Sequence, residues 1–113
     1  MLTVCTGTSL LARTGLLDGK KATSNKKAFE WVKTNGKDVL WNERARWTVD
    51  GKYYTSSGVT AGMDMTLGFL EERHGIELAL RIATDIEYLW IQDKDNDLFV
   101  AQKKHSTTES ISK

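Results

Sequence analysis

The hydrophobic and polar positions of the chain alternate with two different periods, which predicts a mixed α/β domain. Short apolar or β-branched runs bounded by Gly, Asp and Ser are typical of strands, whereas apolar residues that recur every three or four positions are typical of helices. The first residues show both patterns, because a strand-like apolar run at 2–4 is followed by small residues and then by a helix-like apolar segment at 8–13. These patterns predict strands at 2–4, 21–24, 46–49 and 53–56, and helices at 8–13, 27–34, 60–73 and 76–88.

The two central strands are expected to form a hairpin. Asp50-Gly51 lies between two aromatic and β-branched runs, and an Asp-Gly pair in that position favours a tight turn. The helix predicted at 60–73 carries apolar residues on more than one face, so we expect it to be buried. His74-Gly75 is expected to end this helix. In the next helix, the residues expected to form one apolar stripe are Ala79, Ile82, Ala83 and Ile86.

Cys5 is the only cysteine of the chain, and it falls where the first strand gives way to small residues. A lone cysteine most often behaves as a small buried hydrophobe. At a strand-turn-helix junction, however, a nucleophile is lifted clear of the sheet, and the backbone N–H groups that follow it point at whatever it attacks. The helix N-terminus behind it also favours the reactive thiolate. Both interpretations of Cys5 stay open at this point.

Composition narrows the class of protein. A chain of 113 residues with 40% hydrophobic and 27% charged residues suits one small soluble domain. Its formal net charge of +1 gives no electrostatic case for binding nucleic acid or a membrane surface. No apolar run approaches the ~20 residues of a membrane span, and no basic segment precedes a signal-like apolar run. Because one cysteine cannot form an internal disulfide, we expect a reducing compartment and a cytoplasmic protein.

Three segments together resemble the ThiJ/PfpI superfamily, the class I glutamine amidotransferase-like proteins. They are Val4-Cys5-Thr6-Gly7-Thr8, the run from Gly15 to Thr23, and the run from Asp50 to Asp64. The similarity extends from about residue 2 to residue 90, and it is strongest to the branch that includes isonitrile hydratase. It implies that residues 1–92 are the C-terminal part of a family domain. Residues 93–113 are expected to form a polar tail.

The resemblance implies a fold, an activity and a site. The fold is an α/β, flavodoxin-like three-layer sandwich, here incomplete because the first half of the family domain is absent. The activity is the cysteine-dependent hydration or hydrolysis of a small molecule, with Cys5 as the nucleophile and Thr6 beside it at the site. Gly7, Gly58 and Asp64 are expected to contribute to substrate binding. No metal ion or organic cofactor is implied.

Two departures from the family pattern bear on activity. The acidic residue beside the family's nucleophile lies in the first half of its domain, and none of the four residues before Cys5 is acidic. Many relatives carry a histidine just after the segment that matches Ala22-Thr23-Ser24, whereas this chain has Asn25. An asparagine side chain cannot act as a general base near neutral pH. We therefore expect the activity to be impaired by truncation.

Other polar residues have structural interpretations beside the functional ones. Asp64 is expected in the first turn of its helix, where exposed N–H groups stabilise negative charge, and Thr60 is a candidate cap for that helix. His74, at a helix end, is expected to interact with the helix dipole rather than to act in catalysis. His105 falls in the predicted polar tail.

Asp93-Lys94-Asp95-Asn96-Asp97 has the alternating oxygen ligands of a calcium loop. The positions that require Gly and Glu in such a loop hold Leu98 and Lys104 instead. The segment is therefore expected to be a solvated acidic turn without calcium.

Two functional hypotheses follow from these observations. In the first, the protein is a cysteine-dependent hydratase or hydrolase, and its partner is a small-molecule substrate. In the second, it is a non-catalytic remnant or an interaction or dimerisation module of the same fold, for which a homo-oligomer is expected. The sensor half of a transcription regulator is a weaker third hypothesis, because no room for a helix-turn-helix region remains after Trp90. No nucleic-acid or membrane partner is expected.

Overall fold

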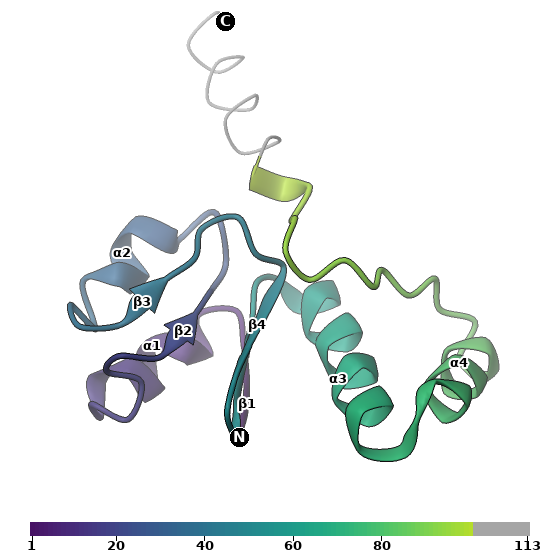
Figure 1. Cartoon of the computed structure of the whole chain (residues 1–113). Helices are drawn as coiled ribbons and strands as arrows, with labels where there is room; N and C mark the ends of the chain where they lie inside the picture. Colours follow the sequence, from purple (N-terminus) through teal and green to yellow (C-terminus); the bar gives the residue numbers. More distant parts are fainter. Residues whose placement is uncertain (101–113) are drawn as a thin grey trace, which may run out of the picture.

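A computed structural model describes residues 1–100 of the protein. Strands and helices alternate up to residue 33, and three strands and then two helices follow (Figure 1). The strands are β1 (Leu2–Val4), β2 (Lys21–Ala22), β3 (Leu40–Trp41), β4 (Trp47–Asp50) and β5 (Tyr53–Ser56). The helices are α1 (Gly7–Arg13), α2 (Phe29–Lys33), α3 (Val59–His74) and α4 (Ile76–Asp85). Most of the polar tail predicted at 93–113 lies outside the described residues.

The central sheet has the strand order β1-β5-β4. β4 and β5 form the predicted Asp-Gly hairpin, in which Asp50 lies opposite Tyr53 and Gly51 has a φ of 59°. β1 lies parallel to β5, with Val4 opposite Ser56. Because the two strands run in the same direction, the carboxyl end of β1 lies beside the point where β5 leads into α3.

A second, two-stranded sheet is formed by β2 and β3, which run parallel with Lys21 opposite Leu40. The hydroxyl of Thr48 in β4 donates to Lys21 O at 3.3 Å and so joins β2 to the central sheet. The sequence predicts a longer strand at 21–24 and no element where β3 lies. Strands of two residues are too short to produce a periodic pattern of apolar positions.

Helices cover both faces of the strands. Figure 1 shows α1 and α2 on one side of the central strands and α3 and α4 on the other. The predicted α/β fold is therefore confirmed. Buried apolar residues form two clusters, one that includes residues of α1 and one that includes a residue of α3. The first contains Leu11, Ala12, Leu17, Ala22, Val39 and Tyr53, and the second contains Trp47, Tyr54 and Met65.

Helix α3 buries one face and exposes the other. Ala61 and Met65 are buried against the strands, whereas Met63 is 39% exposed. The prediction of a buried helix is confirmed for the face toward the sheet and α4 but not for the opposite face. Helix α4 ends one residue before Ile86, which is 53% exposed and so is not part of the predicted buried stripe.

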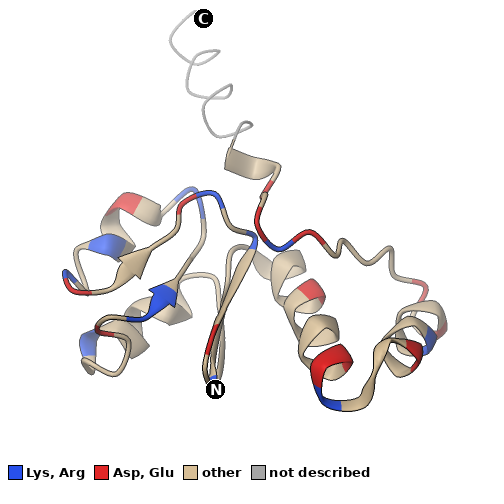
Figure 2. Ribbon diagram, in the orientation of Figure 1, with Lys and Arg blue, Asp and Glu red and all other residues tan. Residues whose placement is uncertain are grey.

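Charged residues lie mostly on the helices and loops, and the central strands contain few of them (Figure 2). Positive and negative residues are interspersed along the chain in this view, in agreement with the formal net charge of +1. None of the helices within residues 1–100 is long and apolar enough to cross a membrane.

We expect the isolated chain to self-associate. β1 is an edge strand of the central sheet, and Leu2 and Val4 are 38% and 39% exposed. An open edge with apolar side chains is a template for pairing with another chain. Light scattering is expected to detect a dimer or larger species, and Leu2→Lys is expected to shift it toward the monomer because an edge lysine opposes pairing. A monomer at high concentration with a cooperative melt above about 65 °C would contradict this expectation.

Gly62 marks a close approach of α3 to β1. A Cβ added at this position would lie 2.8 Å from both methyl carbons of Val4. Gly62→Ala is expected to destabilise the protein by about 1–3 kcal/mol, because a well-packed contact must shift to admit the methyl group. Gly7→Ala is the control, since Gly7 also lies in a helix and a Cβ there meets no atom within 4 Å. Denaturant unfolding measures the free energy of unfolding of the two variants. Equal values would contradict the expectation, because they would show that Val4 moves to admit the methyl group without loss of stability.

Candidate active site

Cys5 lies at a sharp junction between β1 and α1, and its predicted place between a strand and a helix is confirmed. Its φ is +57°, a left-handed backbone conformation that only Cys5 and Glu87 adopt among the non-glycine residues within 1–100. A Cβ crowds the backbone in this conformation at a cost of about 1–2 kcal/mol, so surrounding contacts must hold it. The Cys5 N–H donates to Ser56 O at 3.2 Å, which extends the pairing of β1 with β5 into the junction. The cysteine is half-buried rather than part of the core.

Thr6 and Gly7 follow Cys5 into the first turn of α1. Both residues are exposed, and Thr6 is the N-cap of the helix without a hydrogen bond from its own hydroxyl. Among the hydrogen bonds within residues 1–100, none uses the backbone N–H of Thr6 or of Gly7. Two backbone donors and one hydroxyl next to the cysteine are therefore available to a ligand.

Ser24 and Asn25 hold Cys5 from the loop that follows β2. The Ser24 hydroxyl donates to Cys5 O at 2.6 Å, and the Asn25 side-chain amide donates to Cys5 Sγ at 3.2 Å. The first contact restrains the strained backbone, and the second restrains the side chain. Within residues 1–100, Asn25 is the one side chain that hydrogen-bonds the thiol. Sequence reasoning missed Ser24, because the pattern predicts it as the end of the strand at 21–24, whereas β2 ends at Ala22.

Buried polar side chains fix this loop to the central sheet. The hydroxyls of Thr48 and Thr55 lie 2.6 Å apart across β4 and β5, and Thr55 Oγ1 accepts the Thr23 N–H at 2.9 Å. Lys26 is only 4% exposed, and its Nζ donates to Ala45 O at 2.6 Å and to Thr23 Oγ1 at 2.7 Å. These bonds satisfy polar groups that have lost contact with water, so the loop is firmly placed. The sequence does not mark Lys26 as buried, since lysine is rarely buried without partners.

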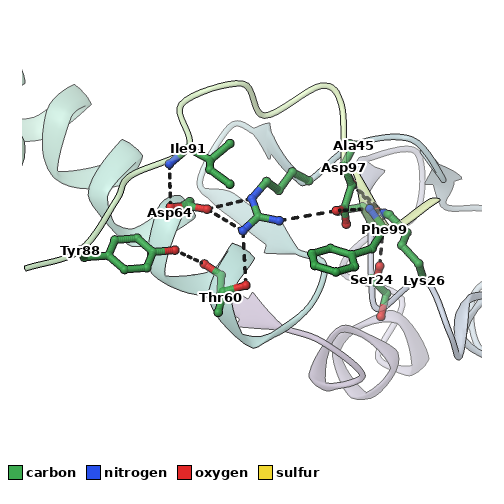
Figure 3. Close-up of polar contacts among 11 residues, drawn as sticks. Ser24, Lys26, Ala45, Thr60, Asp64, Tyr88, Ile91, Asp97 and Phe99 are labelled. Atoms are coloured by element: carbon green, nitrogen blue, oxygen red, sulfur yellow. Dashed lines mark hydrogen bonds and ion pairs between the residues drawn. The ribbon is translucent and has the colours of Figure 1, made fainter. Parts of the chain in front are cut away.

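Asp64 is fully buried and forms an ion pair with Arg46. Figure 3 shows Asp64 with the polar contacts that surround it. Asp64 Oδ2 accepts from Arg46 Nε at 2.8 Å and lies 2.7 Å from Arg46 Nη2, and Asp64 Oδ1 accepts the Ile91 N–H at 3.1 Å. Both carboxylate oxygens therefore have partners. No hydrogen bond within residues 1–100 joins Asp64 to Cys5.

Gly58, with an extended backbone, is the N-cap of α3, so the predicted capping by Thr60 is wrong. Because the helix begins at Val59, Asp64 lies beyond its first turn, and the expected interaction with the helix N-terminus is replaced by the ion pair with Arg46. The Thr60 hydroxyl accepts a hydrogen bond from Arg46 Nη2 at 3.4 Å instead.

The acidic turn predicted at 93–97 is solvent-exposed at residues 93–96, as expected, but Asp97 is buried. It is 6% exposed, and its Oδ1 lies 3.5 Å from Arg46 Nη1 (Figure 3). Its Oδ2 is buried without a hydrogen-bond partner within residues 1–100. The backbone reinforces this contact, because Arg46 N–H donates to Lys94 O at 2.6 Å and Asp97 N–H donates to Arg44 O at 2.7 Å. A contact across fifty positions of sequence leaves no local pattern that could have revealed it.

The segment before Asp97 is tied to α3 as well. Tyr88 Oη donates to Thr60 O at 3.0 Å, and Trp90 Nε1 donates to Asp64 O at 3.2 Å. Burial, and after it the neighbouring Asp64, raises the pKa of Tyr88 above its usual value, so the hydroxyl remains a neutral donor. Asp64 and Arg46 thus organise the start of α3 together with residues 88–97.

The histidines and acidic residues offer no metal site within the described residues. His74 is exposed in the last turn of α3, as predicted, and His105 lies outside the described residues. No group of three or more His, Cys, Asp or Glu side chains within residues 1–100 is arranged to hold a metal ion.

Several known proteins are similar to this chain. The model of the DJ-1/PfpI family matches residues 1–72. Isonitrile hydratase of Pseudomonas putida is 34% identical over 85 residues, which cover 75% of this chain and 36% of that protein. The HTH-type transcriptional regulator GbdR of Pseudomonas aeruginosa is 34% identical over 93 residues, which cover 82% of this chain and 25% of the regulator. The chain thus spans about a third or less of the length of these curated relatives.

Solved structures show the same fold. A ThiJ/PfpI family protein from Pseudomonas syringae superposes with a TM-score of 0.66 at 32% identity, over 77% of this chain and 35% of that chain. An AraC family transcriptional regulator from Pseudomonas putida superposes with a TM-score of 0.65 at 18% identity, over 74% of this chain and 44% of that chain. The second similarity concerns the fold alone.

Removing Asp64 is expected to destabilise the protein strongly. Asp64→Ala leaves the buried Arg46 without its closest carboxylate, and breaking a buried ion pair typically costs about 3–5 kcal/mol. Asp95→Ala is the control, because Asp95 pairs with Lys94 at the surface and a surface pair contributes about 0–1 kcal/mol. Urea unfolding measures both variants. A loss for Asp64→Ala no larger than that for Asp95→Ala would contradict the importance of this ion pair.

Proposed function

Since the chain belongs to the DJ-1/PfpI family, we propose that it carries the nucleophile of a cysteine-dependent hydratase or hydrolase that acts on a small molecule. The observation that carries this proposal is the strained backbone of Cys5 between β1 and α1, with Asn25 bonded to the sulfur. Strained non-glycine residues cluster at functional sites, where the surrounding structure maintains them. The single cysteine also favours a reducing compartment, and we place the protein in the cytoplasm.

Cys5 has the role of nucleophile in this proposal. Its thiolate adds to an electrophilic carbon of the substrate. In a hydration the substrate takes up a proton, whereas in a hydrolysis the bond to the leaving group breaks and that group departs with a proton. Water then attacks the same carbon and the sulfur leaves, so that the net reaction is addition of water or hydrolysis and the thiol is restored. The available N–H groups of Thr6 and Gly7 stabilise the negative charge that develops on the substrate, and the Thr6 hydroxyl orients the substrate or the water.

Gly58 and Asp64 form the α3 side of the site in this proposal. α3 begins directly after Gly58, and its first turns pack against β1, which ends next to the cysteine. Asp64 acts there by holding Arg46 and the 88–97 segment in place, because both of its oxygens have partners. Proton transfer is therefore not its task.

Isonitrile hydratase supplies an analogy for the substrate class, since that relative is 34% identical over 75% of this chain. Isonitriles and activated acyl compounds are therefore the substrates with which the site is tested. Turnover also needs a group that moves protons, which typically contributes about 10²–10⁴-fold in rate. The side chain bonded to Sγ within residues 1–100 is an amide, which cannot supply that step.

A non-catalytic module of the same fold is the second candidate. The observation that favours it is the similarity to an HTH-type transcriptional regulator over 82% of this chain. The same domain therefore occurs in proteins whose names describe regulation. In this candidate Cys5 is a structural or sensing residue, and the surface of the domain binds a small molecule or another copy of the chain.

The test separates covalent reaction from turnover. We expect mass spectrometry to detect a covalent adduct at Cys5 after incubation with an alkyl isonitrile or an activated ester, and no adduct in Cys5→Ser. Turnover by the parent chain is expected to stay near background, because no general acid or base contacts the sulfur in the described part of the chain. Asp64→Asn, if it folds, is expected to form the adduct as the parent does.

Two results would change this account. Failure of both probes to modify Cys5, while a general thiol reagent labels it, would favour the non-catalytic module. Clear turnover by the parent that is lost in Cys5→Ser would overturn the expectation of impaired activity. If Asp64→Asn abolished that turnover in a folded protein, Asp64 would be the acid.

A further inference from the structure

Asn25 makes more contacts with the nucleophile's surroundings than its place in a loop suggests. Its Nδ2 donates to Cys5 Sγ at 3.2 Å. Its Oδ1 accepts the backbone N–H groups of Lys27 at 2.8 Å and of Ala28 at 3.3 Å, at the start of α2. One side chain therefore connects the thiol to the beginning of a helix.

These contacts fix which end of the amide faces the sulfur. Two backbone N–H donors surround one end, and only the carbonyl oxygen can accept from them. The –NH₂ group must then point the other way, at Cys5 Sγ. The orientation is thus required by the hydrogen-bond network rather than chosen between two similar alternatives.

The loop around Asn25 has little freedom to move the amide away. On one side Ser24 donates to Cys5 O at 2.6 Å. On the other side the buried Nζ of Lys26 donates to Ala45 O at 2.6 Å, next to the hairpin strand β4. A donor placed by fixed neighbours on both sides is preorganised, and it loses no rotamer freedom when the sulfur becomes charged.

We propose that Asn25 is a positioning residue that orients Cys5 Sγ and stabilises its thiolate through a hydrogen bond that does not titrate. The inference deepens the proposed function, because it assigns a specific residue to the activation of the proposed nucleophile. An amide N–H donor stays in place at every pH near neutrality. The reactivity of Cys5 should therefore follow the ionisation of the thiol alone.

The first experiment measures the rate at which iodoacetamide alkylates Cys5. No other thiol contributes to the signal, because the chain has one cysteine. Asn25→Asp keeps an oxygen for the backbone N–H groups of Lys27 and Ala28, but it replaces the donor with a negative charge beside the sulfur. We expect the rate at pH 7.5 to fall about tenfold or more, because a like charge in contact disfavours the thiolate.

Asn42→Asp is the matched control. Asn42 Oδ1 accepts the backbone N–H groups of Arg44 at 3.0 Å and of Ala45 at 3.1 Å, the same arrangement as at Asn25, but without a contact to sulfur. Its alkylation rate is expected to equal that of the parent within about twofold. Equal slowing by Asn25→Asp and Asn42→Asp would overturn the proposal and leave Asn25 with a loop-building role.

Asn25→His supplies a second readout that does not depend on the behaviour of the first variant. Its imidazole titrates near pH 6.5, so the profile of alkylation rate against pH is expected to gain a second step there. The parent is expected to show one step. A single-step profile in Asn25→His, displaced only by a constant factor, would also overturn the proposal.

These measurements are independent of turnover, so the two proposals fail separately. Alkylation that responds to residue 25 as expected, without any adduct from isonitriles or esters, would refute the proposed function alone. Adduct formation at Cys5 that does not depend on residue 25 would refute the role of Asn25 alone.

Discussion

The left-handed backbone of Cys5 is the constraint on which the rest of the site depends. A φ of +57° lifts the residue out of the line of β1 and allows α1 to begin two residues later. The conformation costs about 1–2 kcal/mol for a residue with a Cβ, so it persists only where other contacts compensate. Three hydrogen bonds do so: Cys5 N–H to Ser56 O, the Ser24 hydroxyl to Cys5 O, and the Asn25 amide to Sγ. The cysteine is thus held by its backbone and its side chain at once.

Two buried polar networks hold the segments around the central sheet, and the first of them reaches the loop that contacts Cys5. One runs through the threonine hydroxyls of β4 and β5 to Thr23 and so fixes the loop that carries Ser24 and Asn25. The other centres on Arg46, which joins Asp64 of α3 to Asp97 and draws residues 88–97 against the start of that helix (Figure 3). A buried polar group destabilises the fold when it has no hydrogen-bond partner, and a fully paired network favours one arrangement of the segments that it joins. The geometry of the site therefore depends on polar residues as well as on the apolar clusters.

Local patterns predicted the elements that local chemistry determines. The Asp50-Gly51 hairpin, the break at His74-Gly75 and the position of Cys5 between a strand and a helix are all confirmed. The resemblance to the ThiJ/PfpI superfamily is confirmed as well, because the family model covers residues 1–72.

The features that the sequence did not predict depend on contacts between distant segments. β3 is too short to carry a period, and its pairing with β2 comes from the tertiary fold. Asp97 is expected in a solvated turn, and Lys26 gives no signal of burial, because charged side chains usually lie at the surface. Partners far away in sequence bury both. The catalytic roles of Cys5 and Thr6 remain predictions, since geometry can place a nucleophile without demonstrating its reaction.

The most direct test of the strained elbow compares the free energies of unfolding of Cys5→Gly and Cys5→Ala. At an ordinary strand or helix position, glycine is less stable than alanine by about 0.5–1 kcal/mol. At a left-handed position the order reverses, because glycine has no Cβ to crowd the backbone. The account predicts that Cys5→Gly is more stable than Cys5→Ala by about 1 kcal/mol. A Cys5→Gly variant that is the less stable of the two would contradict it.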